Sequence, residues 1–228
     1  MNTSGGKRLN QYVKDYTVFD LETTGLNPET DEIIEISALR VRGGNVIEKF
    51  TALVNPGRPI PYSATRINGI TDQMVENAPS LRQTLPDFLA FIGKDILVGH
   101  NIHSFDLNFL RNGARRTMEQ NIKNDYVDTL SLAKICLPQL HRHRLTDLAA
   151  YFHIAAAGAH RALNDCVMNQ LCYEKLGTLL EQAAENTASG QALPTCPRCG
   201  NVLRKRNGKF GAFWGCAGFP SCRYTQND

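Results

Sequence analysis

Two acidic residues at alternate positions of one short segment carry the strongest chemical signal in the chain. Residues 19–22 read Phe-Asp-Leu-Glu, with Thr-Thr-Gly-Leu directly after them. Alternate side chains of a β-strand share a face, so Asp20 and Glu22 should project together while the neighbouring hydrophobic residues face the core. Adjacent carboxylates repel each other unless a cation lies between them, and Mg²⁺ prefers oxygen ligands. A solvated strand end would also explain this pair, but the Thr-Thr-Gly-Leu sequence favours a metal site.

Two later segments place further acidic residues where the chain passes into a helix. Asp106 closes the segment 100–106, which follows a short apolar run, and open α/β sheets place their sites at such strand ends. Favourable interaction with a helix dipole is the alternative explanation. His160 precedes Asp165 by five residues, which would place the two side chains well apart if both were helical. We therefore expect His160 in a loop, where it could also be a surface or capping residue, and Asp165 in the first turns of a helix.

The apolar pattern predicts the elements that must position these residues. Strands are expected at 16–21, 33–42, 46–54, 96–98 and 126–127, and helices at 81–92, 105–116, 129–136, 145–152 and 161–184. Gly43-Gly44-Asn45 favours a hairpin, since these residues tolerate positive φ. Ser104 and Asp128 are interpreted as helix N-caps. Three antiparallel strands followed by strands that alternate with helices predict an α/β fold with a mixed five-stranded sheet flanked by helices.

Four of the seven cysteines crowd the C-terminal end of the chain. Cys196 and Cys199 form a C-x2-C pair, and Cys216 and Cys222 supply two more thiolates. Four thiolates suit a tetrahedral structural zinc ion, with Zn–S distances of about 2.3 Å. A module of about thirty residues buries little core, so zinc would supply its folding energy. Two disulfides are the alternative, but an odd cysteine count with one tight cluster favours zinc in a reducing cytoplasm.

Charge is unevenly distributed along the 228 residues, although the formal net charge is only +3. Residues 186–228 carry six basic side chains against Asp228 alone, whereas residues 1–185 carry 19 basic and 21 acidic ones. The small, polar residues 186–195 are interpreted as a linker. The sequence therefore predicts a domain at 1–185 joined to a small basic module at 196–228.

Hydropathy gives no indication of a membrane partner. No apolar run reaches the roughly 18–20 residues that a membrane span needs. The first ten residues, MNTSGGKRLN, lack the apolar segment of a signal peptide. We therefore expect a cytoplasmic protein without a membrane contact.

Together, the three acidic segments strongly resemble the motifs of the DnaQ-like DEDDh exonucleases, the family of the proofreading subunit of bacterial replicative polymerases. The family motifs D-x-E-T-T-G-L, H-N-x-x-F-D and H-x-A-x-x-D occur in this order within residues 14–180. The resemblance implies a ribonuclease H-like fold and removal of nucleotides from the 3′ end of a nucleic-acid strand. The matching residues are Asp20, Glu22, Thr23, Gly25, Leu26, His100, Asn101, Phe105, Asp106, His160, Ala162 and Asp165.

The resemblance also implies a role for the matching residues. Asp20 would bridge two Mg²⁺ or Mn²⁺ ions. Glu22 and Asp165 would hold one of these ions, and Asp106 would support the other. His160 would be the general base, because an imidazole titrates near neutral pH. Substrate contacts are implied for Thr23, Gly25, Leu26, His100, Asn101 and Phe105, with a core position as an equal alternative for Leu26 and Phe105.

The cysteine module resembles the zinc ribbons at the C-termini of bacterial type I topoisomerases, through the segments 211–216 and 220–225. Those ribbons bind single-stranded DNA, which implies one structural Zn²⁺ and single-stranded DNA 3′ ends as partners. Aromatic residues interleave with basic ones here, as on strand-binding surfaces, although some of these aromatics should form the core of the ribbon. A proofreading subunit bound to a DNA polymerase and an RNA 3′-end trimming enzyme are the alternatives. A binding module without activity is disfavoured by the complete set of acids.

Overall fold

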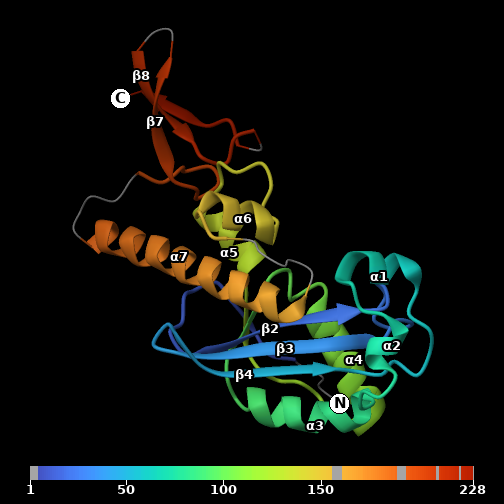
Figure 1. Cartoon of the computed structure of the whole chain (residues 1–228). Coiled ribbons are helices and arrows are strands. Elements are labelled where there is room, and N and C mark those ends of the chain that lie inside the picture. Colours follow the sequence, from blue (N-terminus) through green and yellow to red (C-terminus); the bar gives the residue numbers. More distant parts are fainter. Residues whose placement is uncertain (1–4, 156–160, 189–193, 209–210, 221, 228) are drawn as a thin grey trace.

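A mixed six-stranded sheet is the centre of the structure (Figure 1). The computed structural model describes residues 5–155, 161–188, 194–208, 211–220 and 222–227. Along the sheet the strands follow the order β1-β6-β5-β2-β3-β4. The first four of these run parallel, whereas β3 and β4 are antiparallel to their neighbours. The strands are β1 (Arg8–Leu9), β2 (Tyr16–Thr23), β3 (Ile33–Arg42), β4 (Asn45–Leu53), β5 (Leu97–Gly99) and β6 (Tyr126–Asp128).

All five predicted strands are present, and β1 is an additional edge strand of two residues that pairs with β6. The predicted hairpin joins β3 and β4, whose ends pair at Arg42 and Asn45. Gly43 and Gly44 form its two-residue loop with φ values of 56° and 79°. Positive φ at both positions is typical of the tight hairpin turns that match the twist of the strands.

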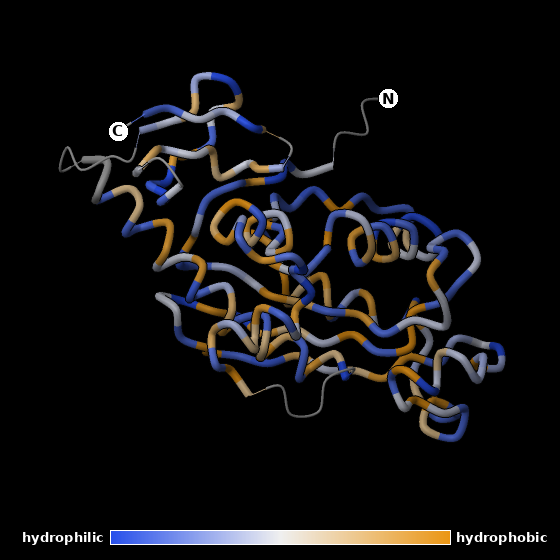
Figure 2. Tube along the Cα trace, turned by 90° about the horizontal axis from the view of Figure 1, so that it is seen from above, coloured by the Kyte–Doolittle hydropathy of each residue, from blue (hydrophilic) through white to orange (hydrophobic). Residues whose placement is uncertain are grey.

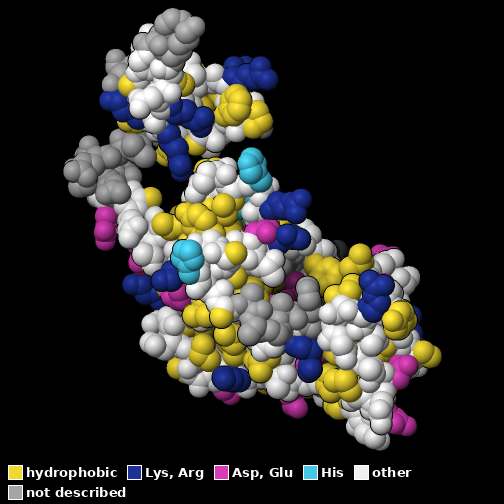
Figure 3. Space-filling model, turned by 45° about the horizontal axis from the view of Figure 1, so that its top comes forward, with side chains coloured by type: hydrophobic (Ala, Val, Ile, Leu, Met, Phe, Trp, Pro, Cys, Tyr) yellow, Lys and Arg dark blue, Asp and Glu magenta, His cyan; other side chains and the backbone are white. Residues whose placement is uncertain are grey.

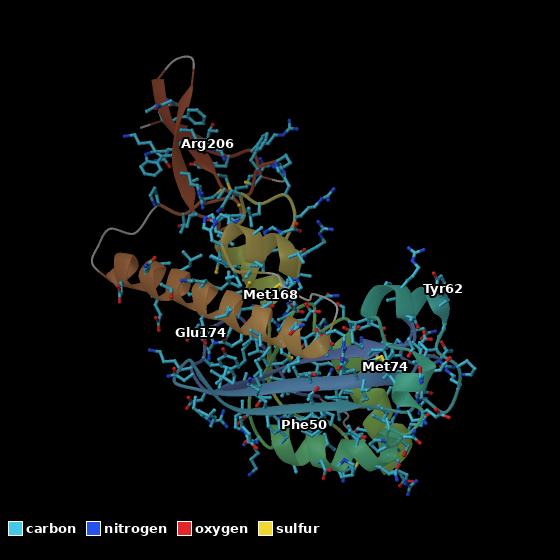
Figure 4. All side chains as sticks on the ribbon, in the orientation of Figure 1. Phe50, Tyr62, Met74, Met168, Glu174 and Arg206 are labelled. Carbon is cyan, nitrogen blue, oxygen red and sulfur yellow. The ribbon has the colours of Figure 1, made fainter. Side chains whose placement is uncertain are left out.

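Helices cover both faces of the sheet. One hydrophobic cluster joins the sheet to α3 and α4, and a second joins the opposite face to α5, α6 and α7. Figure 2 shows apolar segments concentrated between these layers. Phe50 lies on the α3 side of the sheet and Met168 on α7 at the other side (Figure 4). The five helices are α3 (Leu81–Ile92), α4 (Asp106–Met118), α5 (Thr129–Cys136), α6 (Leu145–Tyr151) and α7 (Ala162–Ala188).

The alternation along β2 decides which way the acidic residues point. Phe19 and Leu21 belong to the cluster with α3 and α4, whereas Val18 belongs to the cluster with α7. Successive side chains of a strand point to opposite faces, so Asp20 and Glu22 share the α7 face with Val18. The pattern predicted from the sequence is therefore present in the structure.

Two short helices between β4 and α3 were not predicted. α1 (Tyr62–Asn68) and α2 (Asp72–Val75) pack on the end of β3 through a third hydrophobic cluster that contains Ile34 and Ile70. Neither helix spans enough turns to leave a clear apolar period in the sequence. Their packing places the C-terminal end of α1 at the same edge of the sheet as the end of β2 (Figure 1).

Two predicted boundaries were wrong. Ser104 does not cap α4, because the helix begins at Asp106 with Phe105 in the N-cap position and no side-chain cap. The Ser104 carbonyl instead accepts a hydrogen bond from the side chain of Asn108. The helix α7 continues to Ala188, into the start of the predicted linker. The prediction for Asp128 was correct, since its carboxylate accepts the N–H groups of Leu130 and Ser131 at the start of α5.

The C-terminal module is a separate three-stranded antiparallel sheet in the order β7-β8-β9. Its strands are β7 (Leu203–Gly208), β8 (Gly211–Cys216) and β9 (Thr225–Asn227). Leu203 is fully buried among three cysteines, with Trp214 and Tyr224 packed against them. Across the described residues of both parts, no helix combines the length and the apolar character needed to cross a membrane.

Candidate active site

Three carboxylates from two elements converge above the end of β2. Asp20 and Glu22 project from the strand, and Asp165 lies in the first turn of α7. One oxygen from each carboxylate lies within 4.8 Å of the others. All three side chains are half-buried. A set of oxygen donors this close together fits a hard divalent cation, which would remove their mutual repulsion.

Asp106 lies beside this group, at the first residue of α4. Its side chain is buried, and Oδ1 accepts a hydrogen bond of 3.1 Å from the backbone N–H of Leu21. Leu21 separates Asp20 from Glu22 in the sequence, so this bond ties α4 to the acidic end of β2. Asp106 does not belong to the set of oxygens that lie within 4.8 Å of one another. Among the acidic neighbours of Asp20, however, Asp106 raises the pKa of that carboxyl the most.

The protonation of these acids follows from their burial and mutual repulsion. Burial, followed by the charge of Asp106, raises the pKa of Asp20 well above its ordinary value. Burial and then Asp165 raise the pKa of Glu22 to about 8. Burial also raises the pKa of Asp106 to about 7, although the hydrogen bond from Leu21 opposes this shift. Without a cation the site therefore holds protons near neutral pH, and a bound cation would replace them.

A buried carboxylate that the sequence motifs do not include holds α7 in place. Glu35 of β3 accepts two hydrogen bonds from the guanidinium of Arg161, at 2.8 and 3.2 Å. It also accepts the backbone N–H of Ala162 at 3.2 Å. Because Asp165 follows within one turn of the helix, Glu35 fixes the position of that carboxylate. Its charge also raises the pKa of Asp20 and of Glu22.

Asn68, the last residue of α1, was likewise missed from the sequence. Its side chain is buried, and Oδ1 accepts the backbone N–H of Ile70 at 3.0 Å. A hydrogen bond from the Asn68 side chain to Glu22 lowers the pKa of that carboxyl, against the larger effect of burial. The bond to Ile70 orients the amide so that its NH₂ group faces Glu22. The short helix α1 therefore contributes a polar contact to the acidic site.

The Thr-Thr-Gly-Leu segment forms a tight turn after β2. The hydroxyl of Thr23 donates to the carbonyl of Gly25 at 2.6 Å, and that of Thr24 donates to Asp31 at 3.1 Å. A Cβ added at Gly25 would lie 2.4 Å from a carboxylate oxygen of Asp31, so the turn needs glycine there. Leu26 follows with 82% of its surface exposed. The core position considered for Leu26 is therefore excluded.

The residues of the second motif, His100, Asn101 and Phe105, follow the end of β5 and pack against neighbouring elements. The His100 ring lies 3.1 Å from the Thr129 hydroxyl, and burial lowers the pKa of His100 to about 4. Asn101 adopts a left-handed conformation with φ of 60° and donates its N–H to Asp128. Phe105 packs against the α3–α4 cluster with its ring 5.0 Å from that of Phe109. For Phe105 the core position holds.

His160 lies outside the described residues, so its predicted role stays a prediction. α7 begins at Ala162, two residues later, and brings Asp165 to the site.

The four C-terminal cysteines converge on a common point. All four sulfur atoms lie within 4.8 Å of one another, with 3.7 Å between Cys196 and Cys222 and 3.3 Å between Cys199 and Cys216. A tetrahedral zinc ion with Zn–S bonds of about 2.3 Å separates its sulfurs by about 3.8 Å, whereas a disulfide needs about 2.05 Å. The N–H of Gly218 donates to Cys216. The geometry fits a structural zinc ion and disfavours two disulfides.

Comparison with known families and relatives agrees with both parts of the chain. The exonuclease family matches residues 17–172, and the topoisomerase DNA binding C4 zinc finger matches residues 194–228. DNA polymerase III subunit epsilon of Aquifex aeolicus is 35% identical over 161 residues, which cover 71% of this chain and 79% of that protein. DNA polymerase III PolC-type of Bacillus subtilis is 43% identical over 151 residues. These cover 66% of this chain but 10% of that relative, so the chain spans a small part of the PolC-type proteins.

Solved structures show the same fold. Exonuclease X in complex with 5′ overhanging duplex DNA is 25% identical with a TM-score of 0.57, over 74% of this chain and 93% of that one. Escherichia coli exonuclease I in complex with a dT13 oligonucleotide reaches a TM-score of 0.65 at 21% identity, over 92% of this chain and 54% of that one, and shows the fold alone. The chain belongs to the exonuclease family with a ribonuclease H-like fold, and it carries a topoisomerase-type four-cysteine zinc ribbon at its C-terminal end.

Proposed function

We propose that the chain is a metal-dependent 3′→5′ exonuclease that releases nucleoside monophosphates from single-stranded DNA ends. The convergence of the carboxylates of Asp20, Glu22 and Asp165 within 4.8 Å carries this proposal. Three hard donors on one strand and one helix, beside the buried Asp106, make a site for divalent cations rather than for a general acid and base alone. The names of the relatives, which are DNA polymerase III chains and a DNA-bound exonuclease, favour DNA as the substrate.

The four acidic residues would bind two Mg²⁺ or Mn²⁺ ions. Asp20 would contact both ions, Glu22 and Asp165 would hold one of them, and Asp106 would hold the other. When bound, such ions lower the pKa of the attacking water and neutralise charge on the phosphate and on the leaving 3′ oxygen. Glu35 and Asn68 keep the ligands in position, through α7 and through Glu22 respectively.

The reaction also needs a general base and residues that bind the 3′ end of the strand. His160 would accept a proton from the attacking water as the water oxygen bonds to phosphorus. The phosphorus–O3′ bond breaks and O3′ takes a proton from solvent, which leaves a nucleoside 5′-monophosphate and a shortened strand with a new 3′-OH. Thr23 and the Gly25 turn bind the terminal 3′-OH through backbone groups. Leu26 contacts the terminal bases. Its side chain is available for this contact because 82% of its surface is exposed. His100 and Asn101, which follow β5, would form part of the substrate-binding site.

The zinc ribbon is the second nucleic-acid contact in this proposal. Phe219 is 60% exposed, and a hollow of about 180 Å³ beside it is lined by Phe213, Tyr224, Arg206 and Arg223. Aromatic faces stack on bases while arginines contact phosphates. Arg206 projects from β7 of the ribbon (Figure 4).

A degradation assay with 3′- and 5′-labelled DNA and RNA tests the proposal. With Mg²⁺, wild-type protein should release the 3′ label first as a mononucleotide, and chelation of the metal should stop the reaction. Release of the 5′ label first, or equal rates with a chelator, would refute it. Faster loss of RNA would instead support the alternative of an RNA trimming enzyme.

A polymerase partner is a second candidate, favoured by the epsilon and PolC-type relatives. Pull-down of the replicative polymerase of the source cell with the tagged full chain tests it. A stable complex, resistant to nuclease treatment, would support a proofreading role, and its absence would favour a free-standing enzyme.

A further inference from the structure

A basic hollow opens between α5 and the turn that leads into α6. Its volume is about 540 Å³. Its lining includes Lys134 of α5, His100 and Asn101 after β5, and four residues of the turn, His141, Arg142, His143 and Arg144. Among the described residues, no acidic side chain lines it. A hollow with this lining suits an anion rather than an apolar ligand.

The register of the sheet places this hollow at the catalytic edge. β2 and β5 are parallel neighbours, with Val18 opposite Val98. Asp20 lies two residues further along β2, and His100 directly follows the last residue of β5, so both lie at the same end of the sheet. The hollow therefore lies at the end of the sheet that carries the carboxylates, on the β6 side, whereas α1 with Asn68 lies on the β3 side.

Two of the side chains that line the hollow, those of His143 and Arg144, hold the turn in place. His143 Nε2 lies 3.0 Å from the carbonyl of Leu137, and the Arg144 guanidinium pairs with Asp147 at 3.0 Å. Lys134, His141 and Arg142 are exposed, and within the described part of the chain none of them forms an ion pair. The turn is thus fixed by its own contacts, while Lys134 of α5 and Arg142 of the turn line the hollow without an ion pair among the described residues.

We propose that this hollow binds the phosphates of the nucleic-acid strand that lie immediately upstream of the 3′ nucleotide. The inference rests on the proposed function and adds the path of the substrate. Cationic side chains that follow a backbone are typical of sequence-independent strand binding. The turn before α6 lies on the side of the body nearest the ribbon, and basic and histidine side chains gather on that side (Figures 1 and 3). A strand bound there would run from the acidic site toward the ribbon.

The test compares two double variants that remove the same charge. Lys134→Gln with Arg142→Gln neutralises the hollow. Arg82→Gln with Lys94→Gln is the matched control, because both residues are exposed and lie on or next to α3, at the opposite face of the sheet. Binding of a fluorescent single-stranded DNA 20-mer is measured in a chelator over a series of salt concentrations. Hydrolysis of the p-nitrophenyl ester of thymidine 5′-monophosphate, which has no upstream phosphate, is measured with Mg²⁺.

The hollow variant should bind the 20-mer several-fold more weakly, and its log–log salt slope should be smaller by up to about 1.4, since each lost contact to a single strand contributes about 0.7. Its rate on the ester should equal that of wild type, and the control variant should match wild type in both measurements. An unchanged salt slope, or the same change in the control, overturns the inference. Failure of wild type to hydrolyse either the ester or DNA would refute the proposed function instead, while the binding data still decide the role of the hollow.

Discussion

Replacement of Glu35 by alanine tests whether this residue positions the active site without touching the substrate. The change removes the acceptor of three hydrogen bonds, two from Arg161 and one from the N–H of Ala162. The Arg161 side chain is 43% exposed and can turn to water, whereas Ala162 is fully buried and its N–H cannot. We expect the free energy of unfolding to fall by about 2–3 kcal/mol, in the range for losing charge-assisted hydrogen bonds of which some are replaced by water. For a chain of this size this corresponds to a fall in Tm of roughly 5–10 °C.

The same change should weaken metal binding, because Asp165 lies in the turn of α7 that Glu35 anchors. Loss of a partner that orients a metal ligand typically costs about 10–100-fold in metal affinity or activity. The assay is the Mg²⁺ concentration that gives half-maximal hydrolysis of the p-nitrophenyl ester, together with thermal unfolding. Glu35→Gln keeps an acceptor for the Ala162 N–H and should lose less of both. If Glu35→Ala retains the wild-type Tm and the wild-type Mg²⁺ dependence, then Glu35 does not position the site.

Four further predictions concern the acids, the base, pH and zinc. Asp20→Asn or Asp106→Asn should abolish hydrolysis but leave a folded protein that binds DNA, and wild-type turnover by either variant at saturating Mg²⁺ would show that the ligand set is misassigned. His160→Ala should lower kcat by about 10²–10⁴-fold and remove the limb of the pH–rate profile that reports imidazole deprotonation; persistence of that limb would point to another base. Because the pKa of Glu22 is raised to about 8 without metal, the metal-free fold should lose stability as pH rises from 6 to 8, and Mg²⁺ should increase Tm more at pH 8 than at pH 6. An equal increase at both pH values would contradict this. Cys216→Ser should unfold the ribbon, weaken binding of long single strands and spare hydrolysis of the ester, with zinc content measured by atomic absorption; a variant with full zinc content and wild-type strand affinity would contradict it.

Much of the fold could be predicted from the sequence because its signals are local. The alternation in β2, the two glycines at 43 and 44, and the apolar period of α3 each act over a few residues. The two-residue strand β1 and the short helices α1 and α2 carry no such period. Their structures depend on packing against parts of the chain that are far away in the sequence.

The same distinction applies within the site. The motif residues Asp20, Glu22 and Asp165 stand out because acidic residues occur where a strand or helix brings them together. Glu35 does not, because an acid inside the apolar run of β3 is explained only by Arg161, which lies 126 residues later. Asn68 meets Glu22 through a helix that the sequence did not predict. Asn68 contacts Glu22, and Glu35 contacts Arg161 and the N–H of Ala162, so no spacing rule for metal ligands would have found them.

Hydrogen bonding distinguishes two buried acids near the ends of adjacent parallel strands. Asp128 is the last residue of β6, and Asp106 begins α4, which follows β5. Asp128 accepts backbone N–H groups from both the loop after β5 and the first turn of α5, which uses both of its oxygens in neutral contacts. Asp106 accepts one N–H from another strand, that of Leu21, and leaves acceptor capacity toward Asp20. Burial raises the pKa of Asp106 to about 7, and a cation beside this carboxyl would favour its charged form. Asp106 is therefore a candidate ligand of the proposed metal site, whereas Asp128 caps α5.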